Sequence, residues 1–551
     1  MIEIEEGRMD WSRRDVLTLA GVTFAATALS PSWGRAQTPK RGGTLSIRAW
    51  DPPHFDLHGV GGTSYKTQIV LSFTHSRLLR HKAGPGVTPG IFTIEGDLAE
   101  SWTQPTLTTY VVKLRRGVRW HAKPPVNGRE LTSEDVRYSV ERFLTTPGNA
   151  NAQMLRSVEK VETPDKYTVR FTLREPFAWF LDVLATPMAV AIVARECVEK
   201  FGDLRSPESM IGTGPWMLDS YRPNVGITLV RNPNYFMAGL PNIDRVELVV
   251  DEDNASRMAA FLSGKYHPGW EFPGTINWTD WVQIKDALQQ KRPGLRTMEF
   301  GNNVMTHISM RTDRAPFNDV RVRRAMSLAI DRQGILEAVA EGAGTPNPAV
   351  PAALKEWSLP IAQLGEGARW YQYDPAEARR LLAEAGYPKG FAASMCFTTY
   401  GSTILVDAAT LVIKSLKDVG IEARLDQKEY GAFASTCLIG KFESMAYGPQ
   451  VPFLDPDNFL YGQYYPGEPK NQSHVNDPVL TDLLLRQRRT FDVAQRRQII
   501  YDIQRYLANQ QYYVTLGSPT YTAVWDGALK NYGPNLGFDY GGRLIAAWLD
   551  R

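Results

Sequence analysis

The chain has 551 residues, of which 43% are hydrophobic and 22% charged, and its formal net charge is +3 at pH 7. This composition is typical of a globular protein, and the length predicts two or three lobes rather than a single core. The small net charge argues against a nucleic-acid partner, because a protein that binds phosphates presents a strong basic excess.

The N-terminal segment has the order of residues found in export signals. Arg13 and Arg14 precede an uncharged, mostly apolar run over residues 16–31. Residues 34–36 then place small side chains at the two positions that an export peptidase reads. The paired arginines resemble a twin-arginine signal, and the alternative is a buried N-terminal helix. Because the run is shorter than the roughly 20 residues that span a bilayer, we predict a signal peptide over residues 1–36 and a periplasmic protein.

The beginning of the chain bears on processing in two further ways. Glu3, Glu5 and Glu6 make the lead-in acidic, which is unusual before a signal. Met9 is therefore an alternative to Met1 as the start. No cysteine follows the apolar run, so we expect no lipid anchor and a protein that is free in the periplasm.

Strands are predicted where apolar and polar residues alternate. The expected strands cover residues 44–50, 110–114, 158–162, 167–173, 227–231 and 246–250. Pro164 and Asp165 stand between the third and fourth of these strands, and both residues favour a hairpin turn.

Helices are predicted between and after these strands from capping residues and apolar spacing. The expected N-caps are Thr132, Asn254, Asn318 and Asp374, and the last is the strongest because a proline and a glutamate follow it in the first turn. The expected helices cover residues 133–143, 255–263, 319–331, 375–386, 407–419 and 494–509. Strands mixed with helices along the whole length indicate an α/β fold.

Cysteine is sparse in this chain. The three cysteines are Cys197, Cys396 and Cys437. An odd, widely spaced set predicts neither a disulfide framework nor a CxxC metal motif. A protein that folds before export has no need of disulfides in an oxidising compartment, so we expect no structural disulfide.

Short motifs along the chain stand in an informative order. The sharpest are Arg41-Gly42-Gly43-Thr44-Leu45, Asp97-Leu98-Ala99-Glu100-Ser101-Trp102, Gly212-Thr213-Gly214-Pro215-Trp216, Arg231-Asn232-Pro233-Asn234-Tyr235, Ala315-Pro316-Phe317-Asn318-Asp319-Val320 and Asp455-Pro456-Asp457-Asn458-Phe459. Together they resemble extracellular solute-binding protein family 5, the large receptors of ATP-driven importers for peptides, nickel and related solutes. The order and spacing of the motifs make the resemblance specific, and it covers nearly all of the chain after the predicted signal.

The resemblance implies an α/β, two-lobed periplasmic binding protein fold of type II, in the large cluster with an extra subdomain. A ligand cleft is expected between the lobes. Lobe I would cover residues 37–301, with the subdomain inserted at about 85–205. Lobe II would cover residues 302–515, and residues 516–551 would return to lobe I. A ligand that contacts both lobes would favour their closure.

The resemblance also implies a function. The protein would capture a peptide or peptide-like solute and deliver it to the permease subunits of an ABC transporter in the inner membrane. It would be a monomer without cofactor or catalytic activity. The alternative ligand is an oligosaccharide or an opine-like solute.

Two charged anchors of the dipeptide-binding members have no counterpart here. In those members an Asp holds the ligand amine and an Arg holds its carboxylate. Alignment on the neighbouring motifs places the Asp position at Pro452 and the Arg position near Thr399. Neither side chain carries a charge, so a free dipeptide is disfavoured and a longer or capped peptide, or a non-peptide solute, becomes more plausible.

The ligand contacts expected from this alignment lie in four segments. They are His54, Phe55, Trp270, Glu271, Phe272, Trp278, Thr399, Tyr447, Gln450 and Phe453. Aromatic faces can stack on sugars and flat apolar groups while polar neighbours fix their orientation. The alternative for Trp270, Trp278 and Trp281 is that they belong to the core of a lobe.

Other functions receive less support from the sequence. An exported hydrolase is the alternative of another class, but Gly-x-Ser-x-Gly and His-Glu-x-x-His motifs are absent from the sequence. No haem or cluster motif supports a redox protein. His54 and His58 lie in an extended, proline-containing segment, where a spacing of four does not bring them to one face. We therefore expect no metal site.

Overall fold

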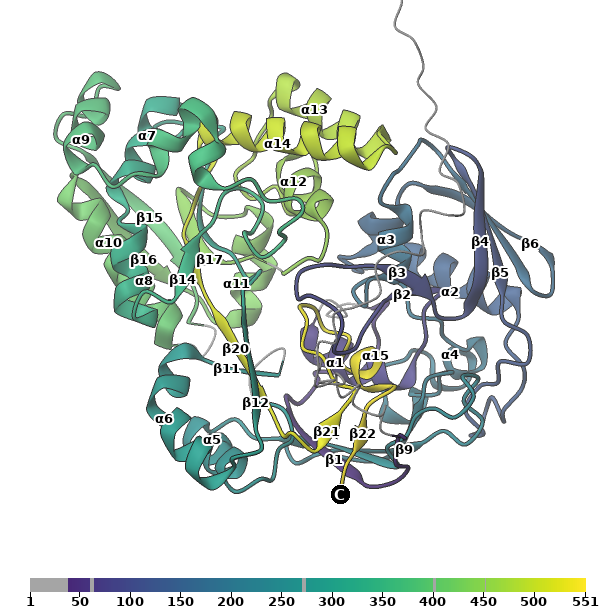
Figure 1. Ribbon diagram of the computed structural model, residues 1–551. Coiled ribbons are helices and arrows are strands. Elements are labelled where there is room, and N and C mark those ends of the chain that lie inside the picture. Colours follow the sequence, from purple (N-terminus) through teal and green to yellow (C-terminus); the bar gives the residue numbers. More distant parts are fainter. Residues whose placement is uncertain (1–37, 60–63, 270–273, 400–402, 451) are drawn as a thin grey trace, which may run out of the picture. The chain divides into compact units, whose positions relative to one another are not determined.

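The computed structural model describes residues 38–59, 64–269, 274–399, 403–450 and 452–551. The predicted signal peptide lies outside these ranges. Residues Lys40–Arg551 form one compact unit, and the following description concerns that unit alone (Figure 1). Within the described ranges, none of the helices combines the length and the apolar character needed to cross a membrane.

A four-stranded sheet organises the N-terminal part of the unit. Its strands, in spatial order, are β1 (Thr44–Ala49), β10 (Arg245–Val250), β9 (Gly226–Arg231) and β8 (Trp216–Arg222). Helix α1 (Tyr65–Thr74) packs against β8 and against α15 (Tyr540–Leu544) near the C-terminus. The contact between α1 and α15 therefore brings the C-terminal segment beside this sheet. Strands β21 (Leu529–Lys530) and β22 (Trp548–Leu549) form a small ladder of their own.

A second, antiparallel sheet lies within the segment expected to be an insertion. Its strands, in spatial order, are β4 (Ala99–Thr106), β5 (Thr109–Leu114), β7 (Thr168–Leu173) and β6 (Val158–Asp165). The predicted hairpin is present between β6 and β7. The shorter elements around this sheet are β2 (Leu79–His81), β3 (Ile94–Gly96), α2 (Ser133–Thr145), α3 (Phe180–Ala185) and α4 (Arg195–Phe201). Helix α2 covers the face formed by β6 and β7.

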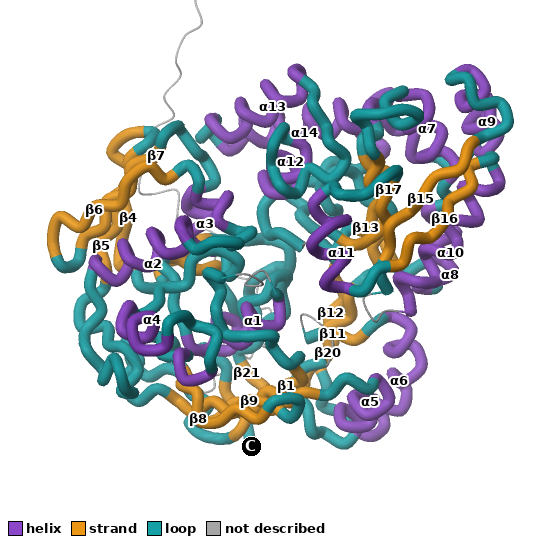
Figure 2. Tube along the Cα trace, turned by 180° about the vertical axis from the view of Figure 1, so that it is seen from behind, coloured by secondary structure: helices purple, strands orange, loops and turns teal. Residues whose placement is uncertain are grey.

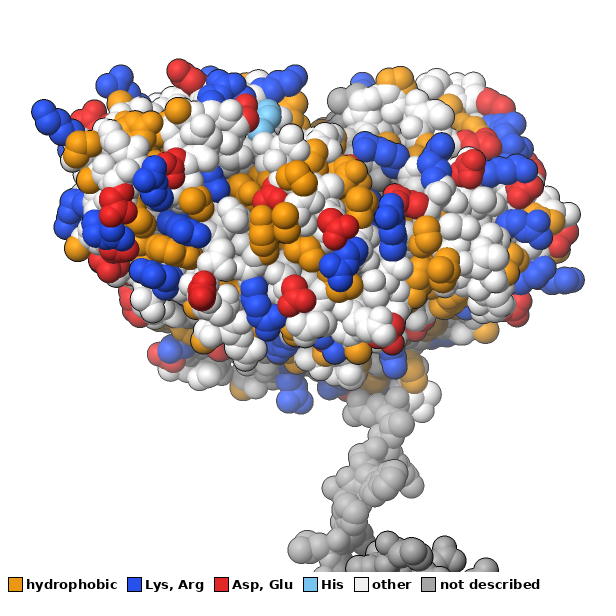
Figure 3. All heavy atoms as spheres, turned by 90° about the horizontal axis from the view of Figure 1, so that it is seen from above, with side chains coloured by type: hydrophobic (Ala, Val, Ile, Leu, Met, Phe, Trp, Pro, Cys, Tyr) orange, Lys and Arg blue, Asp and Glu red, His pale blue; other side chains and the backbone are white. Residues whose placement is uncertain are grey.

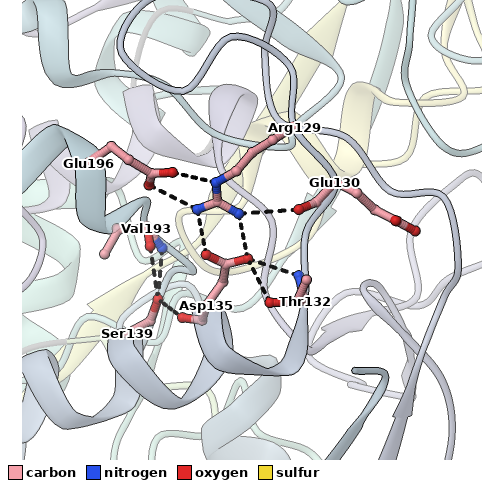
Figure 4. Close-up of polar contacts among 7 residues, drawn as sticks. All are labelled: Arg129, Glu130, Thr132, Asp135, Ser139, Val193 and Glu196. Atoms are coloured by element: carbon pink, nitrogen blue, oxygen red, sulfur yellow. Dashed lines mark hydrogen bonds and ion pairs between the residues drawn. The ribbon is translucent and has the colours of Figure 1, made fainter. Parts of the chain in front are cut away.

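Arg129 ties two helices of this region together (Figure 4). Its guanidinium donates to both oxygens of Asp135 on α2, at 2.9 and 2.7 Å, and to Glu196 on α4. Asp135 also accepts from the N–H of Thr132 at 2.8 Å, which is the predicted capping interaction at the start of α2. The cluster is structural, because each acidic group already has its partner.

A five-stranded sheet organises the other part of the unit. Its strands, in spatial order, are β16 (Ile421–Gln427), β15 (Phe391–Phe397), β17 (Met445–Pro449), β13 (Thr306–Met310) and β18 (Tyr513–Thr515). Strand β15 is parallel to both of its neighbours. The helices of this part are α7 (Val320–Ala329), α8 (Arg332–Ala340), α9 (Pro375–Glu384), α10 (Thr403–Asp418) and α11 (Tyr430–Thr436). A separate apolar core fills this part.

The chain passes between these two parts through a third sheet (Figure 2). That sheet has the order β11 (Thr275–Ile276), β20 (Tyr521–Trp525) and β12 (Arg296–Phe300). One passage leads from β12 to β13, and the other leads from β18 through β19 (Gly517–Pro519) to β20; β19 pairs with β14 (Gly344–Pro346). Helices α5 (Asn254–Leu262) and α6 (Trp278–Lys291) flank this sheet in Figure 1.

Late helices of the chain make contact with the segment that contains α3. They are α12 (Pro456–Tyr464), α13 (Pro478–Arg489) and α14 (Val493–Gln510). The indole Nε1 of Trp179 donates to Gln487 on α13 at 2.8 Å, and the N–H of Ala178 donates to the carbonyl of Arg488 at 2.7 Å. We call this contact, between residues 175–182 and helices α12–α14, the clasp. Its apolar side chains belong to the same core as the N-terminal sheets.

Most predicted elements are present, but two of the predicted caps are wrong. Asp374 caps α9 as expected, accepting from the N–H of Glu377 at 2.9 Å. Helix α5 is capped by Asp253 rather than Asn254, and α7 by Asp319 rather than Asn318. In both cases the aspartate side chain accepts an N–H of the first helical turn. Helix α5 begins one residue earlier than predicted, and α7 begins one residue later.

The expectation of no structural disulfide is wrong. Cys396 on β15 and Cys437 after α11 are bonded, although 41 positions separate them in the sequence, and their Cα atoms lie 6.4 Å apart. The fold brings the end of a strand against the end of a helix, which sequence spacing does not reveal. Cys197 is a buried free thiol.

Candidate functional site

A cavity of about 1360 Å³ lies between the two parts of the unit. It exceeds the roughly 300–1000 Å³ of pockets that hold a drug-sized ligand. Residues that follow β1 and begin α1 line one side, and residues at the ends of β15, β16 and β17 line the other. The starts of α5 and α6 and the segment from β18 to β20 complete the wall.

The first wall is aromatic. Trp50 directly follows β1, and its ring meets that of Tyr65 edge-on with centroids 5.2 Å apart. Tyr65 also stacks on Phe538 at 5.8 Å. The guanidinium of Arg48 lies 3.9 Å from the centre of the Trp50 ring, within the range of a cation–π contact. These contacts fix two aromatic rings at the edge of the cavity.

The second wall is formed where parallel strands end. Because β15, β16 and β17 run in the same direction, their carboxyl ends meet at one edge of the sheet, which is the usual place for a ligand in open α/β sheets. Thr399 follows β15, Tyr430 follows β16, and Tyr447 and Pro449 lie on β17. The side chain of Glu429 accepts from the N–H of Gly431 at 2.7 Å and thereby caps α11.

The third wall contains the start of α6. Trp278 and Asp280 line the cavity there. Asn254 donates to both oxygens of Asp280 at 3.3 Å. Burial raises the pKa of Asp280 above its usual value, and the hydrogen bond from Asn254 opposes that shift. Asp280 therefore has its own partner within the wall.

The structure brings three of the predicted contacts to the cavity. Trp278, Thr399 and Tyr447 all line it. Tyr447 is fully buried, and burial raises the pKa of its hydroxyl. Neither the Tyr447 hydroxyl nor the Trp278 indole N–H has a hydrogen-bond partner among the described residues. Their role as ligand contacts remains a prediction.

Four other predicted contacts lie outside the cavity wall, engaged elsewhere. The ring nitrogen of His54 accepts the N–H of Asp56 at 3.1 Å. Phe55 packs edge-on against a tyrosine, with ring centroids 5.2 Å apart. The Gln450 amide donates to a neighbouring glutamine side chain at 2.5 Å, and Phe453 is buried beneath a lysine. Trp270, Glu271 and Phe272 lie outside the described residues.

The sequence analysis missed several aromatic residues of the wall. They are Trp50, Tyr65, Tyr430 and Tyr521. Trp50 could have been found from its place at the end of the first predicted strand, because the predicted contacts His54 and Phe55 lie only a few residues further on. Tyr430 could have been found from its place directly after a strand that is parallel to its neighbour.

The histidines do not assemble a metal site. No group of three or more His, Cys, Asp or Glu side chains converges among the residues that the structure describes. Burial lowers the pKa of His58 and His121 to about 3, so that both rings are neutral. Nε2 of His58 lies 3.0 Å from the carbonyl oxygen of Ala191, and Nε2 of His121 lies 3.1 Å from that of Gly214. Both rings act as internal hydrogen-bonding groups.

The distribution of surface charge can be followed on one face of the molecule. On the face shown in Figure 3, acidic and basic side chains are interspersed. This agrees with the formal net charge of +3 over 551 residues.

Two lobes that enclose a large cavity define a solute-binding protein fold, and this confirms the predicted fold class. Residues 93–471 match the family described as "Bacterial extracellular solute-binding proteins, family 5 Middle", and the chain belongs to that family. Its members bind solutes outside the cytoplasm, so the predicted class of function is confirmed.

Relatives within the family differ in their ligands. The chain is 28% identical to heme-binding protein A of Haemophilus influenzae over 433 residues, which cover 73% of each protein. It is 27% identical to the glutathione-binding protein GsiB of Salmonella choleraesuis over 356 residues, which cover 63% of this chain and 64% of that relative.

Solved structures show the same fold at lower identity. The periplasmic binding protein DppA of Helicobacter pylori, in complex with the peptide STSA, has a TM-score of 0.77 and 24% identity over 93% of this chain and 99% of that one. AgaA from A. tumefacien R10, in complex with agropinic acid, has a TM-score of 0.77 and 23% identity over 92% and 99%. Both likenesses concern the fold.

Proposed function

We propose that this protein captures a peptide or peptide-like solute in the periplasm and delivers it to the permease subunits of an ABC importer in the inner membrane. The observation that carries the proposal is the cavity of about 1360 Å³, lined from both parts of the unit by aromatic, aliphatic, neutral polar and charged side chains. A ligand that touches both walls favours their closure, which is the state that a permease can recognise.

The size of the cavity favours an extended ligand over a compact one. A drug-sized molecule needs roughly 300–1000 Å³, and a dipeptide falls at the lower end of that range. The solute that fills this cavity is therefore longer than a dipeptide or carries a bulky substituent.

Three charged groups of the wall, Glu252, Asp280 and Lys428, support the same ligand class. Glu252 pairs with Arg48 at 3.3 Å, and Lys428 pairs with Asp426 at 2.9 Å. Asp280 accepts from Asn254 within the wall. Charges that already have partners contribute less to holding a free amine or carboxylate. Pro452 and Thr399, at the expected anchor positions, are uncharged as well. The paired charges and these two residues favour a solute that is held by its main-chain groups and side chains rather than by charged termini.

An oligosaccharide or opine-like solute is the second candidate. The observation that favours it is the aromatic pair Trp50 and Tyr65, because such faces also stack on sugar rings. AgaA, whose structure holds agropinic acid, shares the fold with this protein. Under either candidate, we propose a monomer without catalytic activity. Its lobe I would cover residues 37–301, with a subdomain inserted at about 85–205, its lobe II would cover residues 302–515, and residues 516–551 would return to lobe I.

A thermal-shift screen tests the proposal. The chain without its predicted signal would be melted with di- to pentapeptides, oligosaccharides and opines. A selective ligand raises the melting temperature by mass action. A shift with peptides longer than two residues supports the first candidate, and a shift with sugars or opines alone supports the second. If analysis of the incubated mixtures showed that any of these compounds had been hydrolysed, the hydrolase alternative would instead be supported.

A further inference from the structure

Two helices of the part that holds the five-stranded sheet present only aliphatic side chains to the cavity. The lining side chains are Ile335, Leu336, Val339 and Ala340 of α8, and Ile404, Leu405 and Ala408 of α10. We call these seven residues the aliphatic pocket. Among the residues that the structure describes, neither helix adds a polar side chain to the cavity wall.

The spacing of these residues explains how they come to share one surface. On each helix the lining positions are one and four residues apart, which places them within one broad helical face. Glu337 on α8 and Asp407 and Lys414 on α10 lie on other faces and are exposed. Helices α8 and α10 also pack against one another. The pocket therefore lies where two apolar helix faces meet the cavity.

The pocket is the edge of an apolar core that reaches the cavity. Five of its residues belong to the core of this part, and Ile404 packs against that core. Val339 keeps 7% and Leu405 keeps 9% of its surface exposed, whereas Met310 on β13 is fully buried. Because the pocket residues line the cavity, their remaining apolar surface is available to a solute.

Aromatic rings continue this apolar surface. Tyr447 belongs to the same core and lines the cavity, and its ring centroid lies 6.0 Å from that of Phe397. Trp278, at the start of α6, packs against the same core, and α6 contacts α8. The charged wall residues come from segments other than α8 and α10. They are Lys66, Glu252, Arg257, Asp280, Lys428 and Glu429.

The chemistry of the pocket decides which groups it can hold. Removal of apolar surface from water is favourable in proportion to its area, so a bulky apolar group gains the most. A charged or polar group would lose its hydration without gaining a partner from the aliphatic side chains. The pocket therefore favours large apolar groups over polar and charged ones.

We propose that the aliphatic pocket binds a bulky apolar side chain of the solute, such as that of leucine or phenylalanine, and selects solutes that carry one. This selection rests on the proposed function, whereas the ability of the pocket to bind an apolar group does not. A solute with only small or charged side chains would leave the pocket filled with water and would bind more weakly.

Methyl NMR tests the pocket without any solute. The full chain, with labelled isoleucine and leucine methyl groups, would be titrated with benzene. We expect the methyl resonances of Ile335, Ile404 and Leu405 to shift as benzene binds. Ile413 is the internal control, because it packs against the same core from α10 but does not line the cavity. Unshifted pocket methyls, or equal shifts at Ile413, would overturn the proposal.

A set of related peptides tests the selection. Isothermal titration would compare Ser-Thr-Ser-Ala with four derivatives that carry leucine at one position each, and with the four corresponding aspartate derivatives. We expect leucine in at least one position to tighten binding at least tenfold, about 1.4 kcal/mol, and aspartate to give no such gain. Equal binding of leucine and aspartate derivatives would overturn the proposal. If no peptide binds, the peptide function fails and the benzene titration alone decides on the pocket.

A substitution on α10 separates the pocket from the fold. Ile404→Trp fills the pocket and should abolish the preference for leucine, while affinity for Ser-Thr-Ser-Ala stays within about twofold. Val406→Trp is the matched control, because Val406 is also partly buried against the same core but does not line the cavity. A leucine preference that survives Ile404→Trp, or that is lost equally in Val406→Trp, would contradict the proposed pocket.

A smaller side chain at the same position gives a second test that does not require a larger ring to fit. Ile404→Ala enlarges the pocket, so we expect the preference to move from leucine toward phenylalanine derivatives. The melting temperature of each variant reports whether its fold is intact. The same order of preference in a folded Ile404→Ala variant and in the wild type would count against selection by the pocket.

Discussion

The clasp and the cavity both join distant parts of the chain, but the polar groups of their aromatic side chains differ. In the clasp, the buried indole of Trp179 donates to Gln487, and the Arg488 guanidinium lies 4.2 Å from the ring of Phe177. In the cavity, the indole of Trp278 and the hydroxyl of Tyr447 are buried without a hydrogen-bond partner among the described residues. A buried donor without a partner costs roughly 1–3 kcal/mol. The indole of the clasp therefore stabilises the fold, whereas we propose that a solute completes the interactions of Trp278 and Tyr447 in the cavity.

The comparison predicts the largest effect in the clasp. Trp179→Ala removes the hydrogen bond to Gln487, the edge-on contact with Trp357 at 4.9 Å and the contact with Arg496 at 4.5 Å. We expect the free energy of unfolding to fall by about 3–5 kcal/mol. Urea denaturation measures it. Tyr373→Ala is the control, because that ring is 49% exposed and its loss should be nearly neutral. A loss below ~1 kcal/mol for Trp179→Ala would show that the clasp contributes little.

Buried acids beneath the clasp predict a dependence on pH. Burial and the nearby charges of Asp455 and Asp457 raise the pKa of Asp182 to about 7, and burial with the charge of Asp457 raises that of Asp455 to about 6. Arg496 opposes the shift at Asp182. The folded protein therefore holds protons that the unfolded chain, with a carboxyl pKa near 3.9, releases as the pH rises above about 4. Stability therefore falls as the pH rises from about 4 to about 7 and levels off above the raised pKa values.

The substitution Asp182→Asn isolates this contribution. Between pH 5 and pH 7.5, we expect the free energy of unfolding of the wild type to fall by about 1–2 kcal/mol more than that of the variant. Melting curves of both proteins across this range give the difference between their pH dependences. Groups that titrate in the same way in both proteins do not contribute to this difference. Parallel curves for wild type and variant would contradict a raised pKa at Asp182.

In the cavity, the same kind of substitution should change binding rather than stability. Tyr65→Ala removes a ring that meets Trp50 and Phe538 at the edge of the cavity. We expect affinity for the solute found in the thermal-shift screen to fall at least tenfold, about 1.4 kcal/mol. Isothermal titration measures the affinity, and Tyr373→Ala again serves as the control. Unchanged affinity with an intact fold would remove the aromatic wall from the site.

The fold could be predicted from the sequence because its signals are local. The cap at Asp374, the hairpin after β6 and the alternation over β1 depend on neighbouring residues, and all three are present. The caps at Asp253 and Asp319 were missed by one position, since asparagine and aspartate are both good caps and only the geometry of the helix start decides between them.

The site could be predicted only in part, because its residues come together through the fold. Thr399 was placed at the wall by alignment with a motif further along the chain, and it lines the cavity. Gln450 and Phe453 followed from the same approach but point into the core beneath the clasp. The pairing of Cys396 with Cys437 depends on two elements that meet only in the folded chain, so spacing gave no sign of it.

The smallest effect is expected at the rim of the clasp. Arg489 pairs with Glu175 at 2.8 Å, but the side chains are 51% and 38% exposed. Water and salt screen such a pair, and holding two flexible side chains together costs entropy. We expect Glu175→Gln to change the free energy of unfolding by less than ~0.5 kcal/mol, measured by urea denaturation beside Trp179→Ala. A loss comparable to that of Trp179→Ala would mean that charge at the rim, rather than the buried aromatic contact, holds the clasp.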